Sequence, residues 1–171
     1  MINQLIIKGF KSFVDKSINF NQLNVLTGLN SSGKSTVIQA LQILNKYSRH
    51  FENPLIEGHG DYKELQNPFS SLPFSINAKY GEHGIICYSP QKENNIHTEE
   101  FPDLIVISAD RYGPLVSIPL LSDCELGSKG ENVIKCIQVH ENDILDKLIT
   151  HPNSEGDTFL YNLRAWLGTI T

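Results

Sequence analysis

The chain has 171 residues, of which 40% are apolar and 19% are charged, and its formal net charge is -5. This composition is typical of a globular protein of one domain and excludes a disordered chain. No run of lysines or arginines occurs, so electrostatics gives no support to nucleic-acid binding. No stretch of about 18 apolar residues occurs either, and Cys87, Cys124 and Cys136 form no CxxC pair. We therefore expect a cytoplasmic protein without a membrane segment.

Residues 1–49 predict strands, a glycine-rich loop and a helix. The segments "QLIIKGF" (4–10) and "SINF" (17–20) predict two short strands joined by a turn, and the apolar "LNVLTG" (23–28) predicts a third strand. From Ser35 the apolar spacing becomes helical, with Val37, Leu41 and Leu44 on one face of "STVIQALQILNKYSRH". The order is therefore strand, loop and helix.

Residues 50–110 predict a loop followed by an antiparallel hairpin. The part from 50 to 73 is rich in glycine, proline, asparagine and serine. "FSINAKY" (74–80) alternates between apolar and polar residues, which predicts a half-buried strand, and "GEHG" turns it back into "IICY" (85–88). Further on, "DLIVIS" (103–108) is apolar enough to predict a strand that is buried on both faces.

Residues 111–171 predict mainly helix, in the segments "ENVIKCIQV" (131–139), "ENDILDKLI" (141–149) and "DTFLYNLRAWLG" (157–168). Cys136 and His140 are four residues apart, which suits two metal ligands. No second pair accompanies them, so a core cysteine and a surface histidine are the favoured interpretation. Trp166, with three apolar neighbours on the same segment, predicts a core face or a surface left uncovered in a shortened chain.

The segment "GLNSSGKS" (28–35) matches the phosphate-binding pattern G-x-x-x-x-G-K-[ST], between a predicted strand and a predicted helix. Its glycines permit positive φ, so that backbone N–H groups can face phosphate oxygens. We expect a nucleoside triphosphate with Mg²⁺ as the ligand, with Lys34 on the β and γ phosphates as the catalytic group and the Ser35 hydroxyl on the metal. The predicted binding residues of the loop are Gly28, Asn30, Ser31, Ser32, Gly33, Lys34, Ser35 and Thr36. The alternative is a glycine turn in which Ser31 or Ser32 only caps the helix.

Hydrolysis needs, in addition, a carboxylate after an apolar strand and a group that polarises the attacking water. The nearest candidate is Asp110, at the end of "LIVISAD", but Arg111 occupies the place of a catalytic glutamate. "LGSKGE" (126–131) predicts a glycine turn before a helix.

Together, "GFKSF" (9–13) and "LNVLTGLNSSGKSTVIQALQIL" (23–44) resemble the N-terminal lobe of SMC-like ABC ATPases. That group includes the RecF and OLD families and the anti-phage ATPases of Septu and retron systems. "ISADRYGP" (107–114) and "GSKGENVI" (127–134) look like segments of the bacterial defence members. The resemblance implies an α/β P-loop NTPase fold, in which residues 1–171 form part of an ABC-type ATPase head with an antiparallel β subdomain and C-terminal helices.

The resemblance also implies an ATPase whose two heads pair around two nucleotides, as in a homodimer, and which acts with DNA or an effector nuclease. It places Lys11 and Ser12 near the nucleotide, although a solvated turn lysine is an equal alternative for Lys11. Gln66 could be the family's Q-loop glutamine, although an ordinary loop residue is the favoured interpretation. The signature loop, the Asp-Glu strand and the switch histidine of the family lie in a C-terminal half that residues 1–171 do not contain. We therefore expect a shortened chain, a fragment, or a protein whose second half is another chain.

Two other functions fit the loop. A small P-loop kinase has about this length, but two strands ahead of the loop and an antiparallel hairpin count against it. A non-catalytic nucleotide-sensing module would bind a partner through an uncovered C-terminal face.

Overall fold

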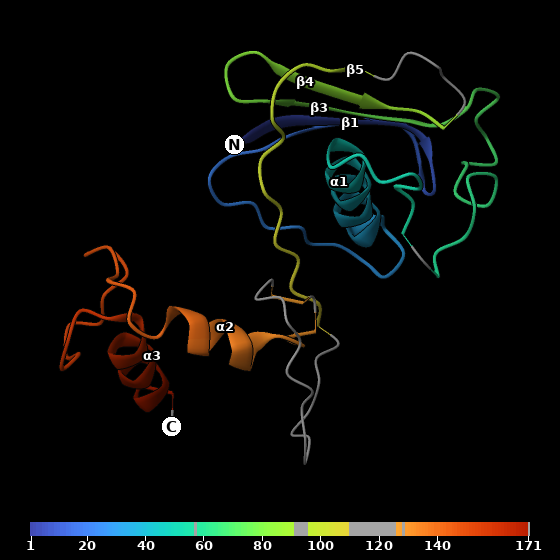
Figure 1. Ribbon diagram of the computed structural model, residues 1–171. Helices are drawn as coiled ribbons and strands as arrows, with labels where there is room; N and C mark the ends of the chain where they lie inside the picture. Colours follow the sequence, from blue (N-terminus) through green and yellow to red (C-terminus); the bar gives the residue numbers. More distant parts are fainter. Residues whose placement is uncertain (57, 91–95, 110–125, 128, 171) are drawn as a thin grey trace. The chain divides into compact units, whose positions relative to one another are not determined.

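The computed structural model describes residues 1–56, 58–90, 96–109, 126–127 and 129–170. The chain divides into two compact units, Met1–Leu104 and Ile105–Thr171. The first unit contains β1 (Ile2–Phe10), β2 (Phe13–Asn19), α1 (Lys34–Ser48), β3 (Ser75–Tyr80), β4 (Gly84–Tyr88) and β5 (Ile96–His97) (Figure 1). The second contains α2 (Val133–His140) and α3 (Phe159–Gly168).

The strands of the first unit form one sheet in the order β2-β1-β3-β4-β5, and every neighbouring pair is antiparallel. Ile7 of β1 lies opposite Lys16 of β2 and Ile76 of β3. The hairpin of β3 and β4 confirms the prediction from "FSINAKY" and "IICY". The short β5 was not predicted, because its segment is polar in sequence and only two of its residues pair with β4.

Helix α1 packs on one face of this sheet (Figure 1). Alternate residues of the strands point at the helix: Leu5 and Ile7 of β1 and Ile76 of β3 are completely buried. The helix contributes Val37, Ala40, Ile43 and Leu44 to the same core. The alternation expected of residues 74–80 is confirmed, since Phe74, Ile76, Ala78 and Tyr80 are at most 3% exposed.

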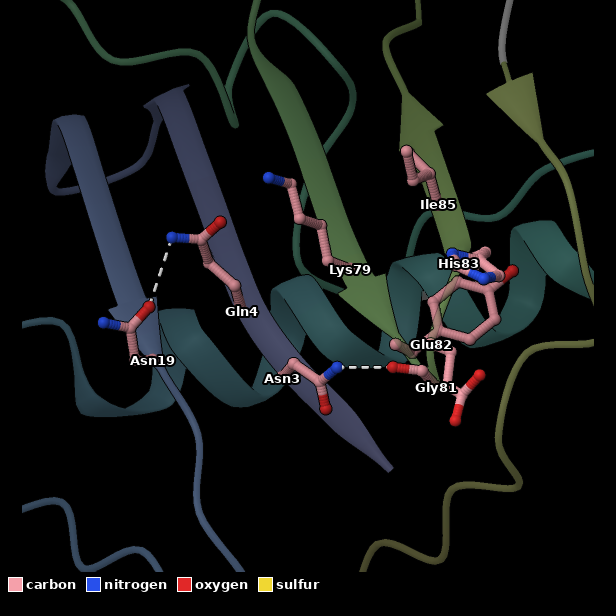
Figure 2. A pocket seen from close by; sticks show the side chains of 10 residues that line it. Asn3, Gln4, Asn19, Lys79, Gly81, Glu82, His83 and Ile85 are labelled. Atoms are coloured by element: carbon pink, nitrogen blue, oxygen red, sulfur yellow. Dashed lines mark hydrogen bonds between the residues drawn. The ribbon is translucent and has the colours of Figure 1, made fainter.

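The opposite face of the sheet carries polar side chains. Gln4 lies between Asn19 of β2 and Lys79 of β3 in register, and its Nε2 donates to Asn19 Oδ1 at 3.1 Å (Figure 2). A hollow of about 500 Å³ opens here, beside the turn from β3 to β4. An antiparallel sheet with one apolar and one polar face can expose the polar face to water.

The strand predicted for residues 23–28 is wrong. In the structure these residues form no regular element, and Leu23 and Val25 are 82% and 75% exposed. The side chain of Asn24 instead bonds the backbone of Asn21, accepting from its N–H at 3.0 Å and donating to its carbonyl at 2.8 Å. Asparagine side chains compete with strand pairing in this way. No strand of the described residues pairs with this segment.

The strand predicted for residues 103–108 is also wrong. Ile105 and Ile107 are 72% and 57% exposed, so the segment is not buried on both faces. Its apolar composition indicated burial, but a strand needs a neighbour to satisfy its backbone. The part of the chain that the structure describes supplies none for these residues.

In the second unit, α2 and α3 confirm two of the three predicted helices, but residues 141–149 form none. Ile144 instead pairs with Thr158 in an isolated antiparallel bridge, and the Leu145 N–H donates to the Asp157 carbonyl at 3.0 Å. Asp146 Oδ1 accepts from the Leu148 N–H at 2.8 Å. These bonds use backbone groups that a helix would need, so the helical period was overridden.

Trp166 of α3 is only partly covered. It is 47% exposed, and its ring meets that of His151 edge-on at 4.6 Å between centroids. Its Nε1 donates to the Ile149 carbonyl at 3.3 Å. The predicted apolar face therefore contacts the loop before α3.

Candidate nucleotide site

A cavity of about 370 Å³ lies where the turn between β1 and β2 meets the loop ahead of α1. It brings together most of the predicted binding residues. Its lining consists of Lys11, Ser12, Asn30, Ser31, Gly33, Lys34, Ser35 and Thr36. Gly28 lies outside this lining, and Ser32 lines a neighbouring hollow of about 390 Å³ together with the apolar Val25 and Leu26.

The loop depends on left-handed backbone at Gly33, where φ is +96°, and at Ser31, where φ is +62°. A Cβ atom added to Gly33 would lie 2.6 Å from Cζ of Phe13 and 2.9 Å from the Ser12 hydroxyl oxygen. Glycine is therefore required at this position for two reasons, the backbone conformation and the close approach of the β1–β2 turn. This contact holds the loop and the turn together around the cavity.

Helix α1 begins at Lys34 without a side-chain cap and without an acidic residue in its first turn. The Val37 N–H bonds the Gly33 carbonyl at 3.2 Å. The N–H groups of Lys34, Ser35 and Thr36 precede the first intrahelical bond, so they are available to a ligand. The helix dipole adds partial positive charge at this end. The alternative in which Ser31 or Ser32 only caps the helix is not supported.

The ammonium group of Lys34 folds back over the loop. It donates to the carbonyls of Gly28 and Leu29, at 2.8 Å and 2.6 Å. Carbonyl oxygens do not neutralise a positive charge, so the lysine adds a full charge to the partial charge of the helix end. The combination favours an anionic ligand.

Lys11 stands on the β1–β2 turn with φ of +49°, and its ammonium donates to Gln39 Oε1 of α1 at 2.7 Å. Burial lowers the pKa of Lys11 below its usual value of 10.5. Next to it, the Ser12 and Thr36 hydroxyl oxygens are 3.5 Å apart. The structure thus places both turn residues, which the family resemblance had indicated, beside the start of α1.

The donor set of the cavity fits Mg²⁺ bound with a polyphosphate. Ser35 is exposed at the cavity and has a hydroxyl oxygen, a hard ligand of the kind that Mg²⁺ prefers. Mg²⁺ normally keeps several waters and takes phosphate oxygens with only one or two protein groups, so one hydroxyl suffices. Asp110, the nearest candidate carboxylate for Mg²⁺ in the sequence, and its neighbour Arg111 lie outside the described residues.

Gln66 does not line the cavity. Its Nε2 donates to the carbonyls of Ser70 and Leu72, at 3.2 Å and 3.1 Å, and this supports the interpretation as an ordinary loop residue. Sequence reasoning missed two other residues near the site, Gln39 on α1 and Asn67 in the loop before β3. Both are polar residues outside any recognisable sequence motif, so nothing in the sequence distinguishes them from other polar residues.

Cys136 and His140 both line an apolar cavity of about 390 Å³ in the second unit. His140 Nδ1 lies 2.7 Å from Asp143 Oδ2. Within the described residues, no group of three or more metal-ligating side chains gathers. His140 is exposed, as expected, but Cys136 is only half-buried, so the prediction of a core cysteine is wrong. Among the described residues, no helix has the length and apolar composition that a membrane-spanning segment needs.

Comparison with known proteins gives three matches. Residues 1–163 match the model of a family described as AAA ATPase domain. A segment of 51 residues, 29% of this chain, is 43% identical to 14% of an ATP/GTP phosphatase from Helicobacter pylori. A segment of 83 residues, 44% of this chain, is 29% identical to 22% of the DNA replication and repair protein RecF from Oenococcus oeni.

The matched segments span less than a quarter of each of these two relatives. The likeness to RecF agrees with the resemblance carried by "GFKSF" and the glycine-rich loop. Because the family model covers nearly all of the sequence, the chain belongs to the AAA ATPase domain family of P-loop ATPases.

Proposed function

We propose that this chain binds ATP with Mg²⁺ in the cavity at the start of α1, as the N-terminal portion of an SMC-like ATPase that acts in phage defence or DNA maintenance. One observation supports it above the others: Lys34 and the first residues of α1, whose N–H groups have no side-chain cap, line one cavity. Gly33 lies beside them, at a position that has no room for a Cβ atom. Membership in an ATPase family agrees with this ligand.

Each residue has a proposed role. Lys34 moves from the loop carbonyls to the β and γ phosphates, where its charge also stabilises the transferring phosphoryl group. Thr36 donates to an α phosphate oxygen, and Ser35 holds Mg²⁺, which neutralises charge on the phosphates. Gly28, Asn30, Ser31, Ser32 and Gly33 supply the backbone of the cradle, and Lys11 and Ser12 close it from the β1–β2 turn.

The affinity expected from these contacts is sufficient. A hydrogen bond to a charged group contributes roughly 1.5 to 3 kcal/mol, and micromolar affinity requires about 8 kcal/mol. Four or five such bonds reach that value before the entropic cost of binding is subtracted. We expect weak but measurable binding.

Hydrolysis, in this proposal, uses groups beyond the cavity lining. No carboxylate belongs to the lining among the residues that the structure describes, and an ATPase of this kind needs one for Mg²⁺ and another group for the attacking water. Head-to-head pairing of two copies would supply them, together with a C-terminal half. DNA is the proposed partner because one relative is named for DNA replication and repair, and an effector nuclease is the alternative partner.

A non-catalytic nucleotide-sensing module is the second candidate, favoured by the same lack of a carboxylate in the cavity lining. A small kinase is less favoured, because two antiparallel strands precede the loop and the sheet is antiparallel throughout. Measuring ADP formation from ATP, with and without a small acceptor, separates a kinase from the other two candidates. We expect little or no turnover by this chain alone. Robust turnover would contradict the need for additional groups.

The binding proposal is tested by titrating the chain with Mg-ATP in a calorimeter. Lys34→Ala should weaken binding at least tenfold, since it removes a charged contact to phosphate. Lys79→Ala is the matched control, because Lys79 lies on the open face of the sheet and outside the cavity (Figure 2). Equal affinity of the Lys34 variant and the parent would remove the phosphate role.

A further inference from the structure

We propose that Asn67, in the loop ahead of β3, is a positioning residue of the nucleotide cavity: it fastens the strained β1–β2 turn so that Lys11 faces the bound phosphates. The inference rests on the proposed function, since it concerns the same cavity. It assigns a role to a loop that the sequence presented only as a connection.

The turn between β1 and β2 is strained at Lys11. Its φ of +49° lies in the left-handed region, which is uncommon for residues other than glycine, asparagine and aspartate. This conformation costs a residue with a Cβ atom roughly 1 to 2 kcal/mol. Gly9, two residues earlier, has a similar φ of +60° at no such cost. The conformation at Lys11 therefore persists only if neighbouring groups hold it.

Asn67 supplies two of the bonds that hold the turn. Its side-chain Nδ2 donates to the Lys11 carbonyl at 2.6 Å, and its backbone N–H donates to the Gly9 carbonyl at 2.7 Å. The Lys11 N–H in turn donates to the Leu65 carbonyl at 2.8 Å. The turn is thus bonded on both sides of the strained residue by two residues of one loop, Leu65 and Asn67.

The bonds from Asn67 to the Lys11 and Gly9 carbonyls are made by a buried residue and not at the surface. Asn67 is 3% exposed, and its Oδ1 accepts from the Phe69 N–H at 2.9 Å. Its side chain is therefore oriented by one bond within its own loop and by one bond to the turn. Leu65 beside it belongs to the hydrophobic core at 2% exposure, which anchors the loop to the first unit.

The fixed turn decides where the Lys11 side chain goes. Lys11 lines the cavity, and its ammonium donates to the neutral Oε1 of Gln39 on α1 at 2.7 Å. If the turn relaxed to an ordinary conformation, the direction of the side chain would change with φ. The Lys11 charge would then leave the cavity while the cradle of α1 stayed intact.

A double-mutant cycle tests this role. Lys11→Met keeps the apolar stem but removes the charge, and it should weaken Mg-ATP binding about tenfold. Asn67→Leu keeps the branching and the number of side-chain heavy atoms but removes both the donor and the acceptor, and it should weaken binding about fivefold in the parent. In the Lys11→Met background the same change should alter affinity less than twofold, because residues that act through one another are not additive.

Thermal unfolding supplies the second readout. Asn67→Leu should lower the unfolding midpoint to a similar extent in both backgrounds, because the buried bonds are lost in each. Gln66→Ala is the matched control: its side chain bonds only its own loop, so it should leave the affinity for Mg-ATP unchanged. If Asn67→Leu does not fold, Asn67→Ser replaces it, since the shorter side chain cannot reach the Lys11 carbonyl.

The outcomes separate the two proposals. Equal losses of affinity from the Asn67 change in both backgrounds would overturn the positioning role, as would an unchanged affinity in the parent. If Lys34→Ala leaves Mg-ATP binding intact, the proposed function itself fails. A Lys34→Ala variant without binding, combined with additive effects of Asn67 and Lys11, would overturn this inference alone.

Discussion

At the scale of single residues, the β1–β2 turn and the glycine-rich loop touch at Gly33, where there is no room for a side chain. The ring of Phe13 and the hydroxyl of Ser12 occupy the space that a Cβ atom would take. From the sequence motif, the glycine is expected because it allows backbone N–H groups to face a bound phosphate. The structure adds a second reason, since the same glycine allows the β1–β2 turn and the loop to approach each other closely.

Gly33→Ala should therefore destabilise the protein by more than the cost of its backbone alone. The left-handed conformation costs alanine roughly 1 to 2 kcal/mol, and crowding against the Phe13 ring adds about 1 to 3 kcal/mol. Gly58→Ala is the control, because φ there is +76° but no described atom lies within 4 Å of the added Cβ. Denaturant unfolding of both variants measures the difference. An equal decrease in the free energy of unfolding of both variants would show that the protein relieves the crowding at Gly33 without cost.

At the scale of elements, α3 is joined to the loop before it by one buried amide. Asn162 is completely buried; its Oδ1 accepts from the His151 N–H at 2.7 Å. Its Nδ2 donates to the carbonyls of Gly156 and Thr158, at 3.1 Å and 2.9 Å. One side chain therefore satisfies three backbone groups of the loop that precedes the helix.

Asn162→Ala should destabilise the second unit by about 2 to 4 kcal/mol, because removing a buried partner leaves backbone groups unsatisfied. Fluorescence of Trp166, the single tryptophan of the chain, reports unfolding of this unit. The exposed Arg164→Ala on the same helix should change stability by less than about 0.5 kcal/mol. An Asn162 variant as stable as the Arg164 variant would contradict the structural role of the amide.

The elements also show where local patterns failed. Residues 141–149 have a helical period, but Asp146 and the bridge between Ile144 and Thr158 take the backbone bonds. By contrast, β3 was predicted correctly because its alternation matches a sheet with one face against α1. Periodicity succeeds where burial on one face decides the structure. It fails where side chains bond the backbone.

For the protein as a whole, the hydrophobic core cluster found among the described residues lies in the first unit, Met1–Leu104. The cluster runs from Leu5 to Phe101 and includes residues of β1, β3, β4 and α1. The candidate nucleotide cavity lies in the same unit. In the second unit, α2 has no buried residue. The two units therefore differ in how well they can sustain a fold.

A chain of residues 1–104 should accordingly fold by itself and keep its affinity for Mg-ATP, since the core and the cavity are both retained. A domain with its own core is expected to fold alone. Circular dichroism, denaturant unfolding and calorimetric titration measure the three properties. Residues 105–171 alone serve as the comparison and should unfold at a lower denaturant concentration. A non-cooperative transition of residues 1–104 would contradict the independence of the first unit.

The glycine-rich loop, helix α1 and the hairpin of β3 and β4 could all be predicted from the sequence, because each depends on local chemistry: glycine at a left-handed turn, and apolar residues repeated at the period of a helix or a strand. The bond from Asn67 to Lys11, and the place of Gln66 outside the cavity, became known only from the three-dimensional arrangement. The same holds for the apolar segments 23–28 and 103–108, which remain without a pairing strand among the described residues. A strand needs a neighbouring strand, and the β1–β2 turn needs Asn67, and both partners lie far away in the sequence. A local sequence pattern contains no information about which distant residue will be the partner.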